Sequence, residues 1–392
     1  MSDNERADLS NWQLPPFNRW GFWHVGEIVH TEPIPRGAGR VRQLPPADEG
    51  DIAAIEYDFQ GRRMSFTDML DETYTDAIVV VHDGRLVFET YAAEGAADRN
   101  HLLMSVSKSL TSALVGALAD RGKLDTNALV TDIIPRLEGT SFEGATIQHL
   151  LDMRTGTTFD ETDYENRDAD VWVYDEVCAM SPKEHDNLPD SVFEFIATRE
   201  NSRPHGGTFE YRSILTDLLG WVASEAGGAS FAQLFSEHIW SKLGCEFDAE
   251  VGVDPHGLAV VNGYICTTAR DLARFGMMFL DLGESGGQRV LSEEWVRRIL
   301  KANPELVAAF APSHEAKYTP NGFYHDCWWV KDPVDGVFAG EGINGQTVFV
   351  HRPSRTVIAK FSSWPEGWHD DYFQPTQAAF YAVCEYLLSR EA

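Results

Sequence analysis

The sequence lacks any apolar run approaching the roughly 18 residues that a membrane-spanning helix needs. Its first residues, Met1-Ser2-Asp3-Asn4-Glu5, also lack the basic and apolar regions of a secretory signal peptide. Neither membrane anchoring nor secretion is therefore expected. The sequence predicts a cytoplasmic protein.

Cysteine is scarce and unpatterned. The chain has five cysteines in 392 residues, an odd number, and no Cys-x-x-Cys pair. Its 13 histidines include no His-Glu-x-x-His pattern. Neither a disulfide framework nor a zinc site is predicted, and buried free thiols in a reducing compartment are the expectation. We expect function to require no metal and no organic cofactor.

Basic residues are also few. There are 32 Lys and Arg against 61 Asp and Glu, which gives a formal net charge of −29 at pH 7. Such a surface repels phosphate backbones and anionic lipids, so neither nucleic acid nor a membrane is an expected partner. Most of these carboxylates are expected to form a solvated surface, with attraction of cationic substrates as the alternative.

The chain does contain enough apolar material for a large core. Apolar residues make up 43% and aromatic residues 11% of the sequence, which excludes a disordered chain. Strand patterns at 77–91 and 327–362 flank the segment 124–250, where helical spacing dominates. We predict an α/β (α+β) fold whose central antiparallel sheet is flanked by helices. The sheet domain comprises 1–123 and 251–392, and 124–250 forms a mainly helical domain between them.

Two segments outside this pattern have distinct expectations. The acidic, aromatic stretch 155–190 is predicted to be a long loop, and a loop of that length can serve as a lid over a pocket. The aromatic and Pro-rich segment 12–26 is too apolar for a free tail. Its Trp20 and Trp23 are expected to be core anchors.

A Ser-x-x-Lys box, Ser105 to Lys108, stands at the start of a predicted helix that continues to about Ala119. Residues three apart share a helix face, so Lys108 is expected beneath Ser105. A buried ammonium can lose its proton or polarise the hydroxyl, and either makes serine a nucleophile. The same pattern occurs by chance on solvated helix faces, but the apolar residues that follow indicate a buried helix.

A second candidate is Tyr211, which lies after the Gly206-Gly207 turn and just before a predicted helix. A tyrosine held near an ammonium has a depressed pKa and can act as base and then as acid. The alternative is an ordinary half-buried aromatic side chain.

The third candidate is the glycine-rich segment 340–345, which reads Gly-Glu-Gly-Ile-Asn-Gly and enters a predicted strand. Glycines let a substrate approach the backbone of an edge strand. A backbone N–H on this strand, together with that of Ser105, could form an oxyanion hole.

At these three places the chain resembles the serine β-lactamase and penicillin-recognising superfamily. Within it, the sequence resembles the 6-aminohexanoate-dimer hydrolases, nylon-oligomer hydrolases related to class C β-lactamases and family VIII carboxylesterases. The resemblance covers nearly the whole chain. The residues that carry it are Trp12-Gln13, Pro15-Pro16, Asn18-Arg19-Trp20, Gly26-Glu27, Tyr74-Thr75-Asp76, 101–110, 146–153, Thr155-Gly156, 268–274, Gly342-Ile343, Gly345-Gln346 and 362–365.

This resemblance implies a role for each matching residue of the catalytic centre. Ser105 would be acylated, Lys108 would assist it, and Tyr211 would pass a proton to the leaving amine or alcohol. The backbone N–H groups of Ser105 and Ile343 would bind the oxyanion.

The resemblance also implies a set of substrate-binding residues: Tyr164, Ser213, Asn262, Trp329 and Asn344. Tyr164 matches a lid tyrosine after a one-residue shift, Asn262 a substrate-side position, and Trp329 a pocket wall. Asp175 or Glu176 falls near an acidic position that can meet a substrate amino group.

The chain departs from these families in two ways. No Lys-Thr-Gly box is present, so the usual cation for a β-lactam carboxylate is missing. Asn344 stands where the nylon hydrolases have a histidine. The leading hypothesis is therefore a serine hydrolase for small linear amides or esters. The alternatives are a D-amino-acid peptidase or weak β-lactamase, and a non-catalytic ligand-binding protein. A homodimer is compatible with each of these hypotheses.

Overall fold

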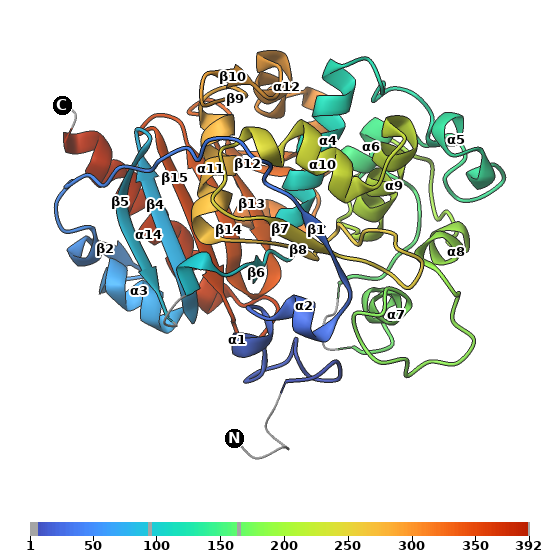
Figure 1. Cartoon of the computed structure of the whole chain (residues 1–392), viewed down its shortest axis with the longest axis horizontal. Helices are drawn as coiled ribbons and strands as arrows, with labels where there is room; N and C mark the ends of the chain where they lie inside the picture. Colours follow the sequence, from blue (N-terminus) through green and yellow to red (C-terminus); the bar gives the residue numbers. More distant parts are fainter. Residues whose placement is uncertain (1–6, 93–95, 163–165, 391–392) are drawn as a thin grey trace.

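The structure is a computed structural model that describes residues 7–92, 96–162 and 166–390. Its centre is a seven-stranded antiparallel sheet in the order β11-β12-β13-β14-β15-β4-β5 (Figure 1). These strands are β4 (Thr75–His82), β5 (Arg85–Tyr91), β11 (Phe323–His325), β12 (Trp328–Asp332), β13 (Val337–Gly342), β14 (Gln346–His351) and β15 (Thr356–Ser362). Since β15 pairs with β4, the early and late parts of the chain share one sheet. The predicted central antiparallel sheet is confirmed.

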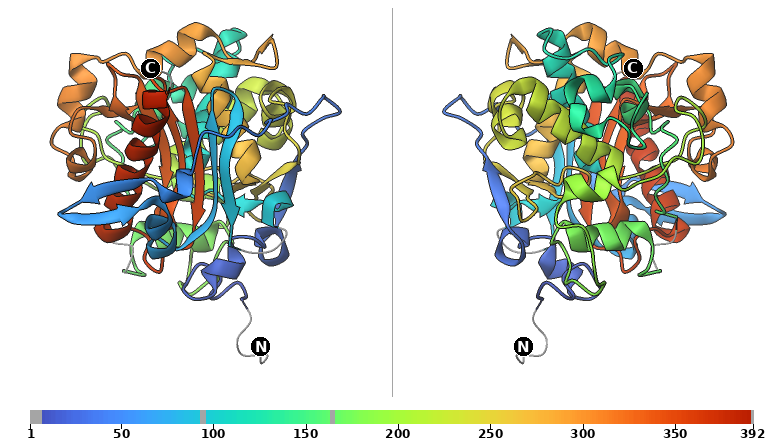
Figure 2. Two further views of the ribbon diagram at one scale, coloured as in Figure 1. Left: turned by 90° about the vertical axis from the view of Figure 1, so that its left-hand side faces the viewer. Right: turned by 90° about the vertical axis from the view of Figure 1, so that its right-hand side faces the viewer.

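Helices cover both faces of this sheet (Figure 2). Helices α4 (Val106–Asp120) and α11 (Ala269–Leu280) pack on one face, and α3 (Phe66–Glu72) and α14 (Asp370–Arg390) pack on the other. The sequence of strand β4 is continuously apolar because both of its faces are buried. Val79 points into the core under α4 and α11, whereas Ile78 and Val80 point toward α14. A strand buried on both faces reads as an unbroken apolar run.

A smaller antiparallel sheet holds the chain just before α4. Its order is β1-β7-β8-β6, with β1 at Thr31–Ile34, β6 at His101–Leu102, β7 at Ala249–Gly252 and β8 at Ile265–Thr267. The Leu103 backbone N–H donates to the Ile265 carbonyl oxygen at 3.0 Å, which extends this pairing almost to Ser105. The sequence did not predict this sheet, because its strands are short and pair across long separations.

The remaining elements are short apart from α9. Between residues 124 and 250 lie α5 (Val130–Ile133), α6 (Ile147–Leu151), α7 (Asp170–Val177), α8 (Val192–Ala197), α9 (Ile214–Gly227) and α10 (Phe231–His238). Elsewhere lie α1 (Asn18–Gly21), α2 (Val25–Ile28), α12 (Glu293–Ile299), α13 (Pro304–Phe310), the hairpin β2 (Glu56–Phe59) and β3 (Arg62–Ser65), and the pair β9 (Glu284–Ser285) and β10 (Gln288–Arg289). The 3₁₀ turns are η1 (Ile52–Ala54), η2 (Ala96–Asp98), η3 (Pro135–Leu137), η4 (Trp240–Lys242), η5 (His314–Tyr318) and η6 (Ile343–Gly345). The division into domains at 123 and 250 stays a prediction.

The segment 155–190 was predicted to be one long loop, and this prediction was wrong because the segment contains α7. Tyr174 and Val177 of this helix are buried in the main core. The Tyr174 ring packs against Phe159 and Phe195, with ring centroids 6.0 and 4.9 Å away. This helix has eight residues, too few for helical periodicity to stand out in an acidic, aromatic segment.

The aromatic segment 12–26 packs on the body as expected, with one exception. Trp12 and Trp23 are buried, but Trp20 keeps 37% of its surface exposed. The Trp20 ring stacks on that of His24, with centroids 3.9 Å apart. The prediction that Trp20 anchors the core was therefore wrong, because its ring packs on His24, one helical turn further along the same segment, and not on the core.

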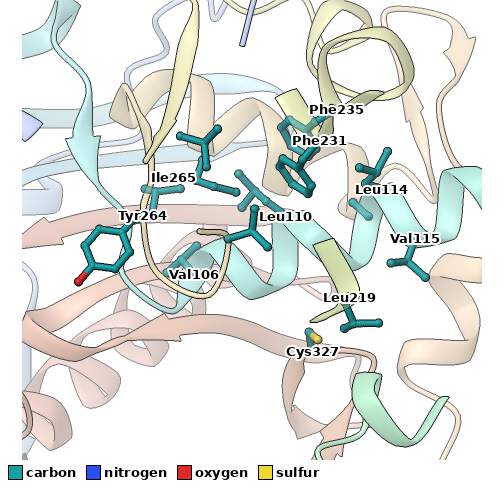
Figure 3. Close-up of a cluster of buried hydrophobic side chains, with 14 of the residues drawn as sticks. Val106, Leu110, Leu114, Val115, Leu219, Phe231, Phe235, Tyr264, Ile265 and Cys327 are labelled. Carbon is teal, nitrogen blue, oxygen red and sulfur yellow. The ribbon is translucent and has the colours of Figure 1, made fainter. Parts of the chain in front are cut away.

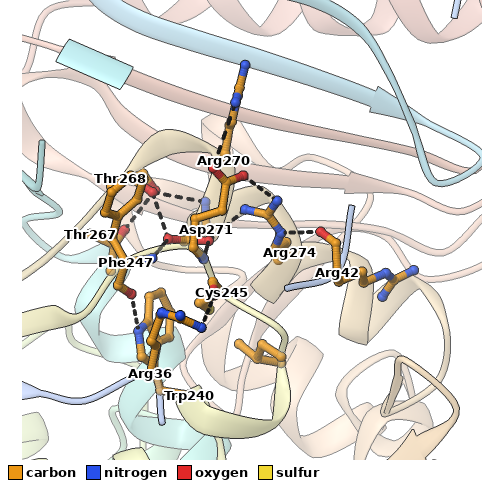
Figure 4. Close-up of polar contacts among 12 residues, drawn as sticks. Arg36, Arg42, Trp240, Cys245, Phe247, Thr267, Thr268, Arg270, Asp271 and Arg274 are labelled. Atoms are coloured by element: carbon orange, nitrogen blue, oxygen red, sulfur yellow. Dashed lines mark hydrogen bonds and ion pairs between the residues drawn. The ribbon is translucent and has the colours of Figure 1, made fainter. Parts of the chain in front are cut away.

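A buried ion pair fixes the start of α11 (Figure 4). Asp271, fully buried, accepts from Arg274 Nη1 at 2.7 Å and from the backbone N–H groups of Glu246 and Phe247 at 2.8 and 3.0 Å. Thr268 caps the helix by accepting from the Asp271 N–H.

All five cysteines are buried free thiols, as predicted. None of the described helices has the length and apolar character that a membrane crossing requires.

Candidate active site

Ser105 stands where the chain turns from β6 into α4. Met104, just before it, has a left-handed backbone with φ of 45°, which is unusual for a residue other than glycine and reverses the chain direction here. The following residues from Val106 to Leu118 are all buried. Figure 3 shows Val106, Leu110 and Leu114 of α4 packed among other buried apolar side chains. The alternative of a solvated helix face is excluded, and Ser105 is the half-buried residue at its start.

Lys108 lies beneath Ser105 and is only 1% exposed. Its Nζ donates to Ser105 Oγ at 2.8 Å, to Ser213 Oγ at 3.0 Å and to the Asn262 carbonyl oxygen at 2.8 Å. Burial lowers the pKa of Lys108 to about 8, although the carboxylates of Glu161 and Asp217 oppose this shift. About a tenth of Lys108 is therefore neutral at pH 7 and can accept a proton from Ser105.

Tyr211 lies against both Lys108 and Trp329. Its ring centroid is 4.9 Å from Lys108 Nζ, and the ring stacks on Trp329 with centroids 5.6 Å apart and planes at 19°. Burial and the Glu161 carboxylate raise the pKa of Tyr211 well above 10, while hydrogen bonding to Ser105 lowers it by less. The expected depressed pKa was therefore wrong, because loss of water raises the pKa of Tyr211 more than the hydrogen bond to Ser105 lowers it. Tyr211 is a protonated phenol at neutral pH.

Strand β13 passes unusually close to the start of α4. A Cβ atom on Gly342 would lie 2.8 Å from the Ser105 backbone nitrogen and 2.9 Å from the Leu103 carbonyl oxygen. On Gly340 it would lie 2.8 Å from Ser109 Oγ. Only glycine allows this approach, which places the chain around Ile343 beside the Ser105 backbone.

Asn344 holds the turn that follows. It adopts a left-handed conformation with φ of 57°, which asparagine tolerates better than most residues. Its Nδ2 donates to the Trp364 carbonyl oxygen at 2.9 Å, and its backbone N–H donates to the Gly367 carbonyl oxygen at 2.7 Å. The side-chain amide is thus engaged by the protein itself.

The other predicted substrate residues divide into two groups. Ser213, Asn262 and Trp329 are brought together around Lys108 and Tyr211 by the contacts above, whereas Tyr164 lies outside the described residues.

The two acidic candidates on α7 make contacts within the protein. Asp175 accepts from Gln13 Nε2 at 2.7 Å and from the Tyr264 hydroxyl. Glu176 lies 2.8 Å from His185 Nδ1. Their proposed contact with a substrate amino group stays a prediction.

Two buried carboxylates that sequence reasoning missed flank Lys108. Glu161, 8% exposed, accepts from Ser213 Oγ at 2.5 Å and from the Ser213 N–H. Asp217 is fully buried on α9, four residues after Ser213. An acid within the apolar run 214–219 was a usable signal for Asp217. Glu161 has no such signal, since it stands in an acidic segment.

The described residues include one group of side chains close enough to hold a metal ion, formed by Asp152, His325 and Asp326. Arg298 already donates to both Asp326 carboxylate oxygens, at 2.6 and 2.7 Å. Gln148 Nε2 donates to both aspartates, at 3.0 Å each. This group is therefore satisfied internally as a buried ionic network.

Comparison with known proteins places the chain in a family. Residues 66–382 match the beta-lactamase family. The chain belongs to that family. It is 35% identical over 367 residues to a 6-aminohexanoate-dimer hydrolase of Paenarthrobacter ureafaciens, covering 92% of this chain and 90% of the relative. The family resemblance predicted from the sequence is confirmed.

Solved structures agree with this family membership. A Bacillus anthracis protein assigned as a 6-aminohexanoate-dimer hydrolase superposes with a TM-score of 0.89 at 26% identity, covering 99% of this chain and 98% of that one. A class C β-lactamase of Rhodobacter sphaeroides shares the fold, with a TM-score of 0.56 at 17% identity over 82% of this chain and 98% of that one. This member of the beta-lactamase family is thus a hydrolase of the serine β-lactamase superfamily with the predicted fold.

Proposed function

We propose that this protein hydrolyses small linear amides or esters through an acyl-enzyme formed on Ser105. The observation that carries the proposal is the 2.8 Å hydrogen bond between Lys108 Nζ and Ser105 Oγ at a buried site. A lysine whose pKa is lowered to about 8 can act as general base for a neighbouring serine at neutral pH.

The proposed reaction divides the proton transfers between two residues. Neutral Lys108 takes the proton of Ser105 as its Oγ attacks the substrate carbonyl. The backbone N–H groups of Ser105 and Ile343 stabilise the resulting oxyanion. Tyr211, a phenol at neutral pH, gives its proton to the leaving amine or alcohol, and Lys108 restores it. Water then attacks the ester carbonyl of the acyl-enzyme and gives up a proton to neutral Lys108, which returns it to Ser105 Oγ as the acid leaves.

The proposed substrate class is a linear amide or ester of modest size. The relative from Paenarthrobacter ureafaciens is named for its action on the 6-aminohexanoate dimer, a linear amide. Trp329 and Tyr211 offer stacked aromatic surface for an aliphatic chain. The buried Tyr324 packs against Trp329, with ring centroids 4.8 Å apart. The segment 340–345 contains neither lysine nor threonine, which disfavours a β-lactam carboxylate.

Active-site labelling tests this proposal. A p-nitrophenyl phosphonate should label Ser105, as read by mass spectrometry of the digested protein, and Ser105→Ala should abolish both labelling and turnover. The matched control is Ser112→Ala on the same helix, whose buried hydroxyl has no hydrogen-bond partner among the described residues. It should keep both properties. Labelling at another serine would refute the assignment.

A substrate panel then separates the function classes. It comprises p-nitrophenyl esters, 6-aminohexanoate oligomers and a chromogenic cephalosporin. Turnover of the first two with little of the third is expected. Turnover of the cephalosporin alone would favour a β-lactamase, and turnover of none would favour a ligand-binding role.

A further inference from the structure

We infer that Asp217 is a positioning residue for Lys108, acting through the carbonyl group of Asn262, and that Tyr174 ties helix α7 to this arrangement. The inference rests on the proposed function, because it assigns what holds the proposed general base in place. It concerns side chains that do not meet the substrate.

Asp217 is saturated with hydrogen bonds from two other segments. Its Oδ1 accepts from the backbone N–H groups of Val261 and Asn262, at 2.6 and 2.8 Å. Its Oδ2 accepts from Asn262 Nδ2 at 2.6 Å and from the Tyr174 hydroxyl at 2.8 Å. A fully buried carboxylate with four donors is a fixed anchor, since breaking any of these bonds leaves a buried polar group unpaired.

The segment that Asp217 anchors presents an acceptor to Lys108. Two of the four donors belong to Asn262, and the carbonyl oxygen of that residue accepts from Lys108 Nζ at 2.8 Å. Asn262 is thus held by its backbone N–H and its side chain while its carbonyl oxygen orients the ammonium. With one Nζ direction fixed there and another at Ser213, the remaining direction points at Ser105.

The same anchor reaches α7. Tyr174 donates from this helix to the carboxylate that holds Asn262, while its ring lies in the aromatic cluster with Phe159 and Phe195. The position of α7 is therefore linked to Lys108 by three successive hydrogen bonds: Tyr174 to Asp217, Asp217 to Asn262, and Asn262 to Lys108. A displacement of α7 would change the direction of the proposed base.

The charges around both groups define a pH signature. Lys108 faces the carboxylates of Glu161 and Asp217, and also Cys327 and the Tyr211 ring. Asp217 faces Lys108, Tyr174, Cys178 and Asn262. Because the Asp217 carboxylate favours the ammonium form, Asp217→Asn removes a charge that raises the pKa of Lys108. A reaction that needs neutral Lys108 should then reach half of its maximal rate at a lower pH.

The test measures the rate at which p-nitrophenyl phosphonate labels Ser105, between pH 5 and 10. Asp217→Asn should lower the maximal rate about tenfold or more and move the midpoint down by more than about 0.3 pH unit. Tyr174→Phe keeps the Asp217 charge and removes one donor, so it should lower the rate severalfold with little change of midpoint. The controls are Glu225→Gln, an exposed carboxylate on the same helix, and Tyr57→Phe, a buried hydroxyl that donates to the Pro375 carbonyl elsewhere. Both should match the unmodified protein.

The outcomes separate this inference from the proposed function. Labelling of Ser105 in the unmodified protein, together with an unchanged maximal labelling rate in Asp217→Asn, would overturn the positioning role alone. If Asp217→Asn does not fold, Tyr174→Phe decides, and a labelling rate equal to that of Tyr57→Phe overturns the inference. Failure of the unmodified protein to react at Ser105 would remove the proposed function and this inference with it.

Discussion

Gly342 lies against the backbone of Ser105 so closely that a methyl group there would sit 2.8 Å from the Ser105 nitrogen. The gap between β13 and α4 is therefore set by the absence of a side chain. This contact joins the proposed nucleophile to the strand that carries the second proposed oxyanion donor, Ile343.

Gly342→Ala should separate β13 from α4 and displace the Ile343 N–H. The φ of Gly342 is −133°, which alanine adopts freely, so the change acts by contact alone. We expect kcat to fall at least about tenfold, with a destabilisation of about 1–3 kcal/mol typical of overpacking. Steady-state kinetics and urea unfolding measure the two effects. Gly207→Ala, whose Cβ would have no neighbour nearer than 3.6 Å, should change neither. Unchanged kcat in Gly342→Ala would argue against an oxyanion hole at this strand.

Tyr211→Phe should harm amide hydrolysis more than ester hydrolysis. An amine leaves only with a proton, whereas p-nitrophenoxide leaves without one, and Tyr211 is the phenol placed to supply it. The expected loss of kcat/KM on an amide is about 10²–10⁴-fold, with a smaller loss on a p-nitrophenyl ester. Equal losses on both substrates would instead assign Tyr211 to activation of Ser105.

Activity should rise with pH up to about 8, because Lys108 must be neutral to accept the Ser105 proton. With the pKa of Lys108 lowered to about 8, only about a hundredth of the lysine side chains are neutral at pH 6. A pH profile of kcat/KM for an uncharged ester measures this midpoint. A profile that is flat between pH 6 and 8 would contradict the assignment of Lys108 as base.

Glu161→Gln should move that midpoint to lower pH. The Glu161 carboxylate is the strongest of the charges that raise the pKa of Lys108, so its removal favours the neutral amine at a given pH. Ser213 keeps an acceptor in the glutamine side chain, which limits the structural change. The exposed Glu200→Gln, in the same part of the chain, should leave the profile unchanged. A shift to higher pH would have the wrong sign and reject this electrostatic role.

Arg274→Ala should destabilise the protein far more than Arg297→Ala. Arg274 and its partner Asp271 are 1% and 0% exposed, whereas Arg297 and Glu293 are 57% and 48% exposed. Removing one member of a buried pair costs about 3–5 kcal/mol, while an exposed pair contributes at most about 1 kcal/mol. Urea unfolding gives both values. Comparable destabilisation by the two changes would show that Asp271 finds another partner.

Local patterns were enough to predict much of the fold. The hairpin of β4 and β5, the buried helix α4 and the strands β14 and β15 follow from apolar spacing and turn residues in the sequence. The small sheet that precedes Ser105 could not be predicted in this way. Its two-residue strand β6 becomes a strand only because β8 lies beside it.

The candidate site, like the fold, was predicted only in part from the sequence. The boxes of Ser105, Lys108 and Tyr211 are visible in the sequence, and the structure brings them together. Glu161 became a candidate only when its partner Ser213 was seen, whereas the apolar run 214–219 around Asp217 was a signal in the sequence that its role could not be read from. The pKa of Tyr211 was misjudged for a related reason, since the extent of its desolvation depends on residues far along the chain.

The pairing of β15 with β4 has a consequence for how the protein is made. During synthesis, β4 and β5 leave the ribosome long before β15, so the inner edge of β4 waits without its neighbour. That edge carries the apolar run 77–81 and is a template for wrong pairing until the C-terminal strands arrive. The Ser105 backbone meets Gly342 at the same late stage. The nascent chain therefore completes the proposed active site only near the end of translation, and keeping β4 from wrong pairing until then is a task suited to a chaperone.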